Sequence, residues 1–254
     1  MNLTKFDYHL HTKHSDGEMS FNDLLEALKG NVDVCGVSDH FELRHSYSID
    51  LSRNYINEFN SFREKAKNAG ITVYLGVETG LGKKGVLLPY RSNEIEYTIA
   101  SLHKVPLEEP DMNEYWNTYK EIISANVRRG GFNILGHVEG YIPLLPFIDN
   151  DSSFKKKREI EQHIIEKYFT AEWYSALAKD LVESNVALEI HEPSETPRLS
   201  VLDIMKQSGV TFSYGTDSHM AKQVSKRNYL NMVIKELNLK KSDFLDIEKI
   251  AQKI

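Results

Sequence analysis

Residues 6–18, FDYHLHTKHSDGE, place His9, His11, His14 and Asp16 close together, directly after the first apolar residues of the chain. In a β-strand, residues two positions apart point to the same face. His9 and His11 would therefore face the same side, with Leu10 on the other. Such a pair can hold a ligand or can arise by chance, and the rest of the chain has to distinguish the two.

Beyond this stretch, short apolar runs alternate with helical patterns. The predicted strands cover residues 6–12, 32–40, 72–79, 97–104, 132–139, 186–193 and 211–219. The predicted helices cover residues 21–29, 55–69, 115–129, 154–184, 199–208 and 223–237. Strand–helix alternation predicts a parallel sheet, and seven such strands suggest a closed or nearly closed α/β barrel. A doubly wound open sheet is the alternative.

Bulk composition limits the class of protein. The 254 residues show no linker, so we expect one domain over residues 1–254. A net charge of −6 disfavours a general nucleic-acid binder, and Cys35 alone cannot form an internal disulfide. We find no signal-peptide pattern and no apolar run long enough for a membrane span, so we expect a cytoplasmic protein.

Side chains that can bind metal ions stand at the end of every predicted strand. They are His9 and His11, Asp39 and His40, Glu78, His103, His137 and Glu139, Glu189 and His191, and Asp217 and His219. The carboxyl ends of the strands of a parallel barrel share one face, where active sites are built. One histidine there is usually structural, but burying so many imidazoles and carboxylates together costs too much without metal ions or close pairing. We therefore predict one shared pocket, with His9 and His11 at one corner.

The residue types indicate the metal and the chemistry. Mixed imidazole and carboxylate ligands suit zinc, manganese or iron, and the number of candidates exceeds what one ion takes. We expect two or three divalent ions. A multinuclear site of this kind generates hydroxide near neutral pH and favours hydrolysis, with phosphate esters as the obvious substrates.

Six motifs, in order, resemble those of the polymerase and histidinol phosphatase (PHP) family. They are HLHTKHSDG (9–17), SDH (38–40), GVETG (76–80), ASLHK (100–104), LGHVE (135–139) and GTDSH (215–219). Within that family the chain looks most like the stand-alone histidinol-phosphate phosphatases. The resemblance implies a distorted seven-stranded TIM-like barrel and a phosphomonoester hydrolase that uses a metal-bridging hydroxide. L-Histidinol phosphate, from histidine biosynthesis, is the implied substrate.

The resemblance also implies three metal positions. The first would be held by His9, His11, Glu78 and Asp217. The second would share Glu78 and be completed by His103 and His137. The third would be held by Asp16, His40 and His219, with His14 either replacing or assisting Asp16 or lying in an exposed loop. Asp39 would orient a neighbouring side chain.

Two departures from the family pattern put the named substrate in doubt. His191 stands in EIHEP, where an asparagine is usual, and could be a ligand, a proton donor, a substrate contact or a residue that bonds a loop. No basic residue occurs in residues 138–153, where the phosphatases carry a phosphate-binding arginine. The remaining candidates for holding phosphate are Arg198, Lys104, Arg44 and His45, with residues 155–158 (KKKR) as a further cationic run.

The alternatives to a histidinol-phosphate phosphatase are a related phosphoesterase or a protein that only binds metal. Another small phosphate ester could be the substrate, such as a nucleotide or sugar phosphate, or a phosphodiester. A non-catalytic metal-binding module is the other possibility. In each enzymatic case we expect a small phosphorylated metabolite as the partner and neither nucleic acid nor membrane; the oligomeric state stays open.

Overall fold

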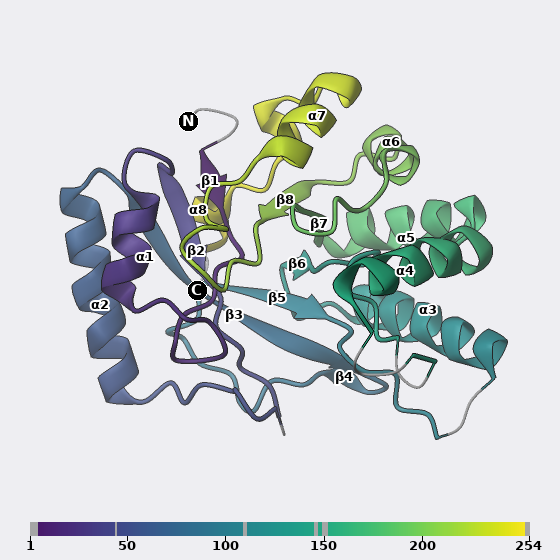
Figure 1. Ribbon diagram of the computed structural model, residues 1–254, viewed down its shortest axis with the longest axis horizontal. Coiled ribbons are helices and arrows are strands. Elements are labelled where there is room, and N and C mark those ends of the chain that lie inside the picture. Colours follow the sequence, from purple (N-terminus) through teal and green to yellow (C-terminus); the bar gives the residue numbers. More distant parts are fainter. Residues whose placement is uncertain (1–4, 44, 109–110, 145–146, 149–151, 252–254) are drawn as a thin grey trace.

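The computed structural model describes residues 5–43, 45–108, 111–144, 147–148 and 152–251. Seven parallel strands follow one another around the sheet in chain order (Figure 1). They are β1 (Phe6–Asp7), β2 (Val34–Val37), β3 (Thr72–Gly82), β5 (Tyr97–Ser101), β6 (Ile134–Leu135), β7 (Ala187–His191) and β8 (Phe212–Gly215). A short strand, β4 (Gly85–Val86), pairs antiparallel with the end of β3.

The sheet nearly closes between its first and last strands. The backbone N–H of Tyr8 donates to the carbonyl of Tyr214 at 3.0 Å, and Leu10 pairs with Ser218 in a parallel bridge. Asp7 strengthens this seam, because its carboxylate accepts hydrogen bonds from the backbone N–H and the hydroxyl of Thr216. The predicted distorted (β/α)7 barrel is thereby confirmed.

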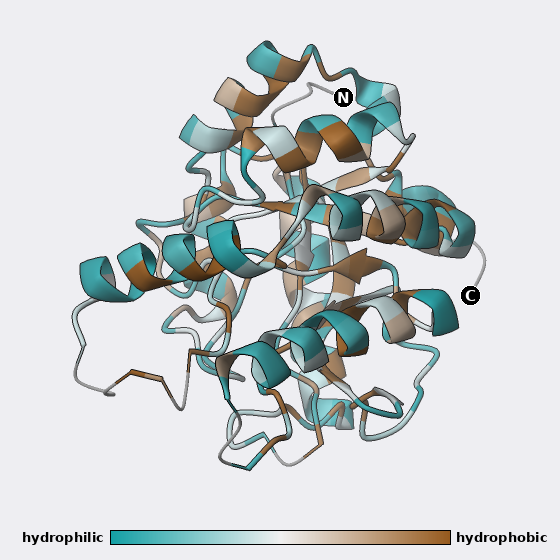
Figure 2. Ribbon diagram, turned by 90° about the vertical axis from the view of Figure 1, so that its right-hand side faces the viewer, coloured by the Kyte–Doolittle hydropathy of each residue, from teal (hydrophilic) through white to brown (hydrophobic). Residues whose placement is uncertain are grey.

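Helices cover the outside of the sheet. They are α1 (Phe21–Leu28), α2 (Arg53–Asn68), α3 (Met112–Arg129), α4 (Phe154–Tyr168), α5 (Ala171–Ser184), α6 (Leu199–Gln207), α7 (Asn228–Leu237) and α8 (Ile247–Ala251), with a 3₁₀ turn η1 (Lys241–Asp243). Figure 1 shows α1 and α2 beside one side of the sheet and α3, α4 and α5 beside the other. Hydrophobic residues follow the strands, and hydrophilic ones run along much of each helix (Figure 2).

Two helix predictions differ most from the observed bounds, and the helix predicted over residues 115–129 begins earlier, at Met112. The single helix predicted over residues 154–184 is two helices, because the chain leaves the helix at Phe169 and Thr170 caps a new one by accepting from the N–H of Trp173. The helix predicted over residues 223–237 begins only at Asn228. By contrast, α1 begins at Phe21 as predicted, because Ser20 and Asp23 form a reciprocal capping box.

The barrel interior below the strand ends is filled by Tyr97. Its ring lies against Gly36 and Gly76 on β2 and β3, where a Cβ atom would overlap the ring. Its hydroxyl donates to the carbonyl of Tyr8 at 2.7 Å. The two glycines therefore let one aromatic side chain join β5 to the segment after β1. Among the described residues, no helix combines the length and the apolarity that crossing a membrane requires.

Candidate metal centre

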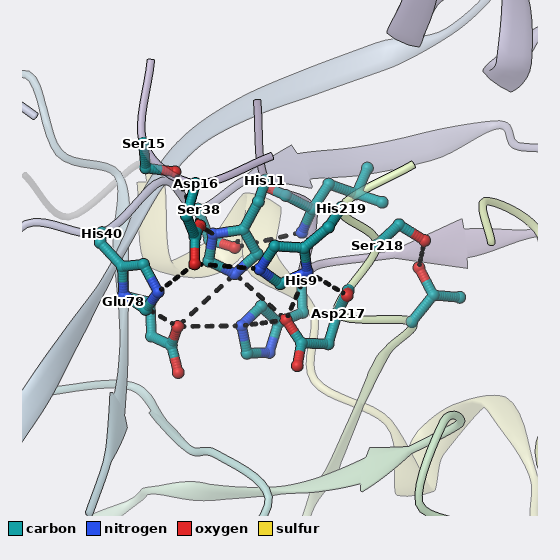
Figure 3. Close-up of polar contacts among 12 residues, drawn as sticks. His9, His11, Ser15, Asp16, Ser38, His40, Glu78, Asp217, Ser218 and His219 are labelled. Atoms are coloured by element: carbon teal, nitrogen blue, oxygen red, sulfur yellow. Dashed lines mark hydrogen bonds and ion pairs between the residues drawn. The ribbon is translucent and has the colours of Figure 1, made fainter. Parts of the chain in front are cut away.

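All nine predicted metal ligands come together at the carboxyl ends of the strands. Figure 3 shows seven of them, drawn from the segments that follow β1, β2 and β8 and from β3. Their ligand atoms form four groups, each within 4.8 Å: His9, His11 and Asp217; His11, His40 and Glu78; His11, Asp16 and His219; and Glu78, His103 and His137. The groups share His11 and Glu78, so they form one continuous cluster.

Glu78 occupies the centre of this cluster. One carboxylate oxygen, Oε2, lies 3.3 Å from Nδ1 of His40 and 3.4 Å from Nε2 of His9. The other, Oε1, lies 3.1 Å from Nε2 of His103 and 3.0 Å from Nε2 of His137. Glu78 therefore places a carboxylate oxygen toward histidines from four different segments of the chain.

Two aspartates complete the cluster. Oδ1 of Asp217 lies 3.2 Å from Nε2 of His11, and Oδ2 of Asp16 lies 3.2 Å from Nε2 of His219 and 3.4 Å from Nε2 of His40. Asp217 has a φ of 46° and His137 a φ of 23°, a backbone conformation that costs on the order of 1 kcal/mol or more. Such strain is typical of positions where the direction of a side chain matters more than local stability.

The donor set fits divalent metal ions. Within the described structure, Nε2 of His9, both ring nitrogens of His11 and Nδ1 of His40 are buried and make no hydrogen bond. Buried unpaired ring nitrogens are costly on their own, and carboxylates face them at 3.2 to 3.5 Å. Cations placed between these rings and carboxylates would satisfy both, because neutral imidazole and carboxylate are ligands for zinc, manganese and iron.

The charges in the cluster depend on one another. Burial acts to raise the pKa of Glu78, but His9, His103 and His40 hold it well below its usual range. Burial acts to lower the pKa of His103, but Glu78 and Glu42 raise it to about 10. Without metal, the cluster therefore balances its carboxylates with protons on histidine, and metal binding would release those protons.

Two further carboxylates hold the candidate ligands from behind. Oε1 of Glu189 lies 2.6 Å from Nδ1 of His9, and its Oε2 accepts the backbone N–H of His137 at 2.8 Å. Oε2 of Glu42 lies 2.9 Å from Nδ1 of His103. Gly215 and Gly80 make room for these carboxylates, since a Cβ atom at either position would overlap them. Contacts of this kind fix the ring orientation and the tautomer of metal-binding histidines.

Sequence reasoning placed Glu189 among the strand-end groups without a specific role and missed Glu42 altogether. The one pointer to Glu42 in the sequence is its position two residues after His40, in the same loop.

Asp39 and His14 lie around the cluster rather than in it. Asp39 accepts hydrogen bonds from the N–H and hydroxyl of Thr12 at 2.7 and 2.8 Å and from the hydroxyl of Ser15 at 2.7 Å. It thereby holds the loop that carries Asp16. His14 points toward α2, where its Nε2 lies 3.3 Å from Glu58.

His191 stands directly beside a candidate ligand. Its Nε2 lies 3.3 Å from Oδ2 of Asp217, and its Nδ1 lies 2.5 Å from Oγ of Ser194. The side chain is fully buried. The structure therefore places this departure from the family pattern against the cluster.

Some of the predicted phosphate-binding residues lie beside the cluster, and others are engaged in contacts elsewhere. The ring of His45 packs 4.5 Å from that of His40, and Lys104 is exposed directly after His103. Arg198 instead pairs with Glu139 at 3.3 Å and donates to the carbonyl of Phe169. Arg44 lies outside the described residues. Of the run at residues 155–158, Arg158 binds Glu161 and the carbonyl of Ser194, next to His191.

Known proteins share this architecture. Histidinol phosphate phosphatase from Lactococcus lactis subsp. lactis, solved with zinc, L-histidinol and phosphate, aligns with a TM-score of 0.67 and 20% identity over 96% of this chain and 99% of that one. A structure from work on YwqE of Bacillus subtilis and CpsB of Streptococcus pneumoniae, metal-dependent tyrosine phosphatases, aligns with a TM-score of 0.51 and 12% identity over 98% and 94%. At these identities the likeness concerns the fold. No curated protein sequence matched the chain.

The family assignment rests on a sequence match. The model of the PHP domain matches residues 7–192, which include every candidate ligand except Asp217 and His219. Those two residues come from the segment after β8 and complete the cluster in space. The chain belongs to the PHP family, and it has the fold of that family's metal-dependent phosphoesterases.

Proposed function

We propose that this protein is a metal-dependent phosphomonoesterase and that L-histidinol phosphate is its substrate. The observation that carries the proposal is the position of Glu78, whose Oε2 faces His40 and whose Oε1 faces His137. We assign a first cation to His9, His11, Glu78 and Asp217, whose facing atoms lie 3.2 to 3.6 Å apart. A second is assigned to Glu78, His103 and His137. A third is assigned to Asp16, His40 and His219, because Oδ2 of Asp16 lies 3.4 and 3.2 Å from Nε2 of the two histidines; His11 also lies close to Asp16 and His219. Bound divalent ions would supply a nucleophilic water at neutral pH and offset the charge of the phosphate.

The residues of the chain position the substrate and the ligands. Glu189 and Glu42 hold His9 and His103 in one orientation, and Asp39 holds the loop of Asp16. Burial lowers the pKa of His191, so its ring is favoured in the neutral form. We therefore assign His191 to orienting Asp217 and not to donating a proton. His45 and Lys104 are the phosphate contacts that we favour, because they lie on or next to the cluster.

Arg198 is already engaged by Glu139, so we assign it to holding the loop after β7.

The test is phosphate release with manganese, zinc or iron supplied. L-Histidinol phosphate is compared with nucleotide phosphates, sugar phosphates and a phosphodiester. We expect a kcat/KM for histidinol phosphate of about 10⁴ M⁻¹s⁻¹ or more, well above the others. Glu78→Gln should abolish turnover and lower the bound metal while the protein stays folded.

Each other outcome has a definite meaning. Weak and indiscriminate turnover would remove histidinol phosphate and leave a phosphoesterase of different specificity. Preference for the diester would favour the phosphodiesterase alternative. Metal binding without turnover of any ester would support the non-catalytic module.

A further inference from the structure

Large apolar side chains are exposed mainly on the loops at the carboxyl ends of the strands. This side of the barrel carries the candidate ligands and is called the metal face here. In the part of the chain that the structure describes, six such side chains are exposed, and four of them lie on the loops after β2, β4 and β6. These four are Leu43, Tyr47, Tyr90 and Tyr141. Single exposed apolar residues are common, so the significance of these rings depends on how they connect to the candidate ligands.

Two of these rings continue a series of rings that begins at the candidate ligands. On one side, the ring of His45 lies 4.5 Å from His40 and 5.9 Å from Tyr47. On the other side, the ring of Tyr141 lies 6.3 Å from His137 and 5.0 Å from His191. Tyr47 is 56% exposed and Tyr141 40%, so both rings reach the surface.

Both series start at the same carboxylate. His40 faces Oε2 of Glu78 at 3.3 Å, and His137 faces Oε1 at 3.0 Å. Both tyrosines therefore lie at the ends of ring series that lead from Glu78 to the surface. The organic group of an ester whose phosphate binds at this cluster would extend toward the surface where these rings lie.

We propose that Tyr47 and Tyr141 bind the organic part of the substrate and select phosphate monoesters of alcohols that carry a planar ring. This inference rests on the proposed phosphomonoesterase. Aromatic rings attract one another when their centroids lie about 4.5–7 Å apart in offset or edge-on arrangements, which a puckered ring cannot reproduce. An open-chain polyol would in addition lose hydration of its hydroxyl groups against an aromatic ring.

The reaction itself is ordinary hydrolysis. The ester P–O bond breaks, the oxygen of water takes its place on phosphorus, and the alcohol leaves with a proton from that water. The tyrosines take no part in these steps. They act on the affinity for the alcohol group, so their contribution should appear as a ratio between two esters of equal reactivity.

Benzyl phosphate and cyclohexylmethyl phosphate form such a pair. They have the same carbon skeleton, and in both the leaving group is a primary alcohol of similar acidity. We expect the metal-loaded protein to favour benzyl phosphate in kcat/KM by about threefold to tenfold. Tyr47→Leu and Tyr141→Leu should each bring the ratio closer to one, whereas Tyr47→Phe and Tyr141→Phe should keep it. Leucine suits position 141 because the residue has a φ of 51°, which a β-branched side chain tolerates poorly.

Met232→Ala is the matched control, because Met232 is an exposed apolar residue on α7, outside the loops of the metal face. It should leave the ratio unchanged. A wild-type ratio near one, or a ratio that neither leucine variant alters, overturns the inference while the phosphomonoesterase stands. An equal fall in the phenylalanine and leucine variants also overturns it, since the hydroxyl and not the ring would then be responsible. Failure to hydrolyse either ester, or any other monoester, overturns the proposed function and the inference with it.

Discussion

At the scale of single residues, the orientation of the histidines depends on carboxylates that are not candidate ligands. Glu42 contacts Nδ1 of His103, and Glu189 contacts Nδ1 of His9. We expect Glu42→Gln and Glu189→Gln to weaken metal affinity about 10- to 100-fold, because an amide holds the ring less firmly and lowers its basicity. Metal titration followed by elemental analysis measures this affinity.

Glu58→Gln is the control for these two variants. Glu58 pairs with His14 on the side of α2, away from the cluster, so this change should leave metal affinity as it is. Equal affinities in all three variants would show that the two carboxylates do not support the ligands.

Most candidate ligands could be predicted from the sequence because they lie at or just after the ends of predicted strands, and parallel strands end on one face. Asp16 was implied by the family motif alone. Glu42 could not be predicted, because its contact depends on how the loop after β2 folds back over β3 and on the space left by Gly80. The pairing of Arg198 with Glu139 escaped prediction for a similar reason. These two residues are far apart in the chain, and only the packed loops bring them together.

At the scale of elements, the seam between β1 and β8 contains a buried acid. Burial raises the pKa of Asp7 to about 6, against hydrogen bonds from Thr216 that act to lower it. In the unfolded chain the same group titrates near 3.8. The folded state thus binds its proton more tightly, so this contribution to stability is present below about pH 4 and is lost as the pH rises through 6.

We therefore expect Asp7→Asn, which cannot ionise, to gain stability relative to the wild type between pH 4 and pH 7. The full difference would be about 3 kcal/mol. Urea unfolding of the metal-free proteins at several pH values measures the change. A constant difference between the two proteins across this range would contradict the shifted pKa.

Element bounds were predicted well where a local signal exists and poorly where tertiary packing decides. Ser20 and Asp23 fix the start of α1 by themselves. The break between α4 and α5 falls at Phe169, an apolar residue in a continuous helical pattern, whose buried ring packs against Trp116 and Tyr119 of α3. That packing is not visible in the periodicity, and the cap at Thr170 lies within a continuous helical pattern, so the sequence was predicted to form one helix.

At the scale of the whole molecule, the cluster of candidate ligands draws side chains from six of the seven parallel strands and the loops after them. Candidate ligands follow or lie on β1, β2, β3, β5, β6 and β8, so occupied sites would tie together segments from residue 9 to residue 219. Because the unfolded chain does not preserve this arrangement, metal should bind the folded state selectively and stabilise it by mass action.

Removal of metal should therefore lower the melting temperature. At a free metal concentration about 1,000 times the dissociation constant, binding stabilises the folded state by about 4 kcal/mol, which for a chain of this size corresponds to roughly 10 °C. Melting curves recorded with a chelator, and again after manganese or zinc is restored, measure the difference. In Glu78→Gln the shift on restoring metal should be much smaller, because two of the candidate ligand groups include that carboxylate. Identical melting temperatures with and without metal in the wild type would mean that the cluster is held by its own hydrogen bonds and ion pairs. The buried unpaired nitrogens of His9, His11 and His40 would then need another explanation.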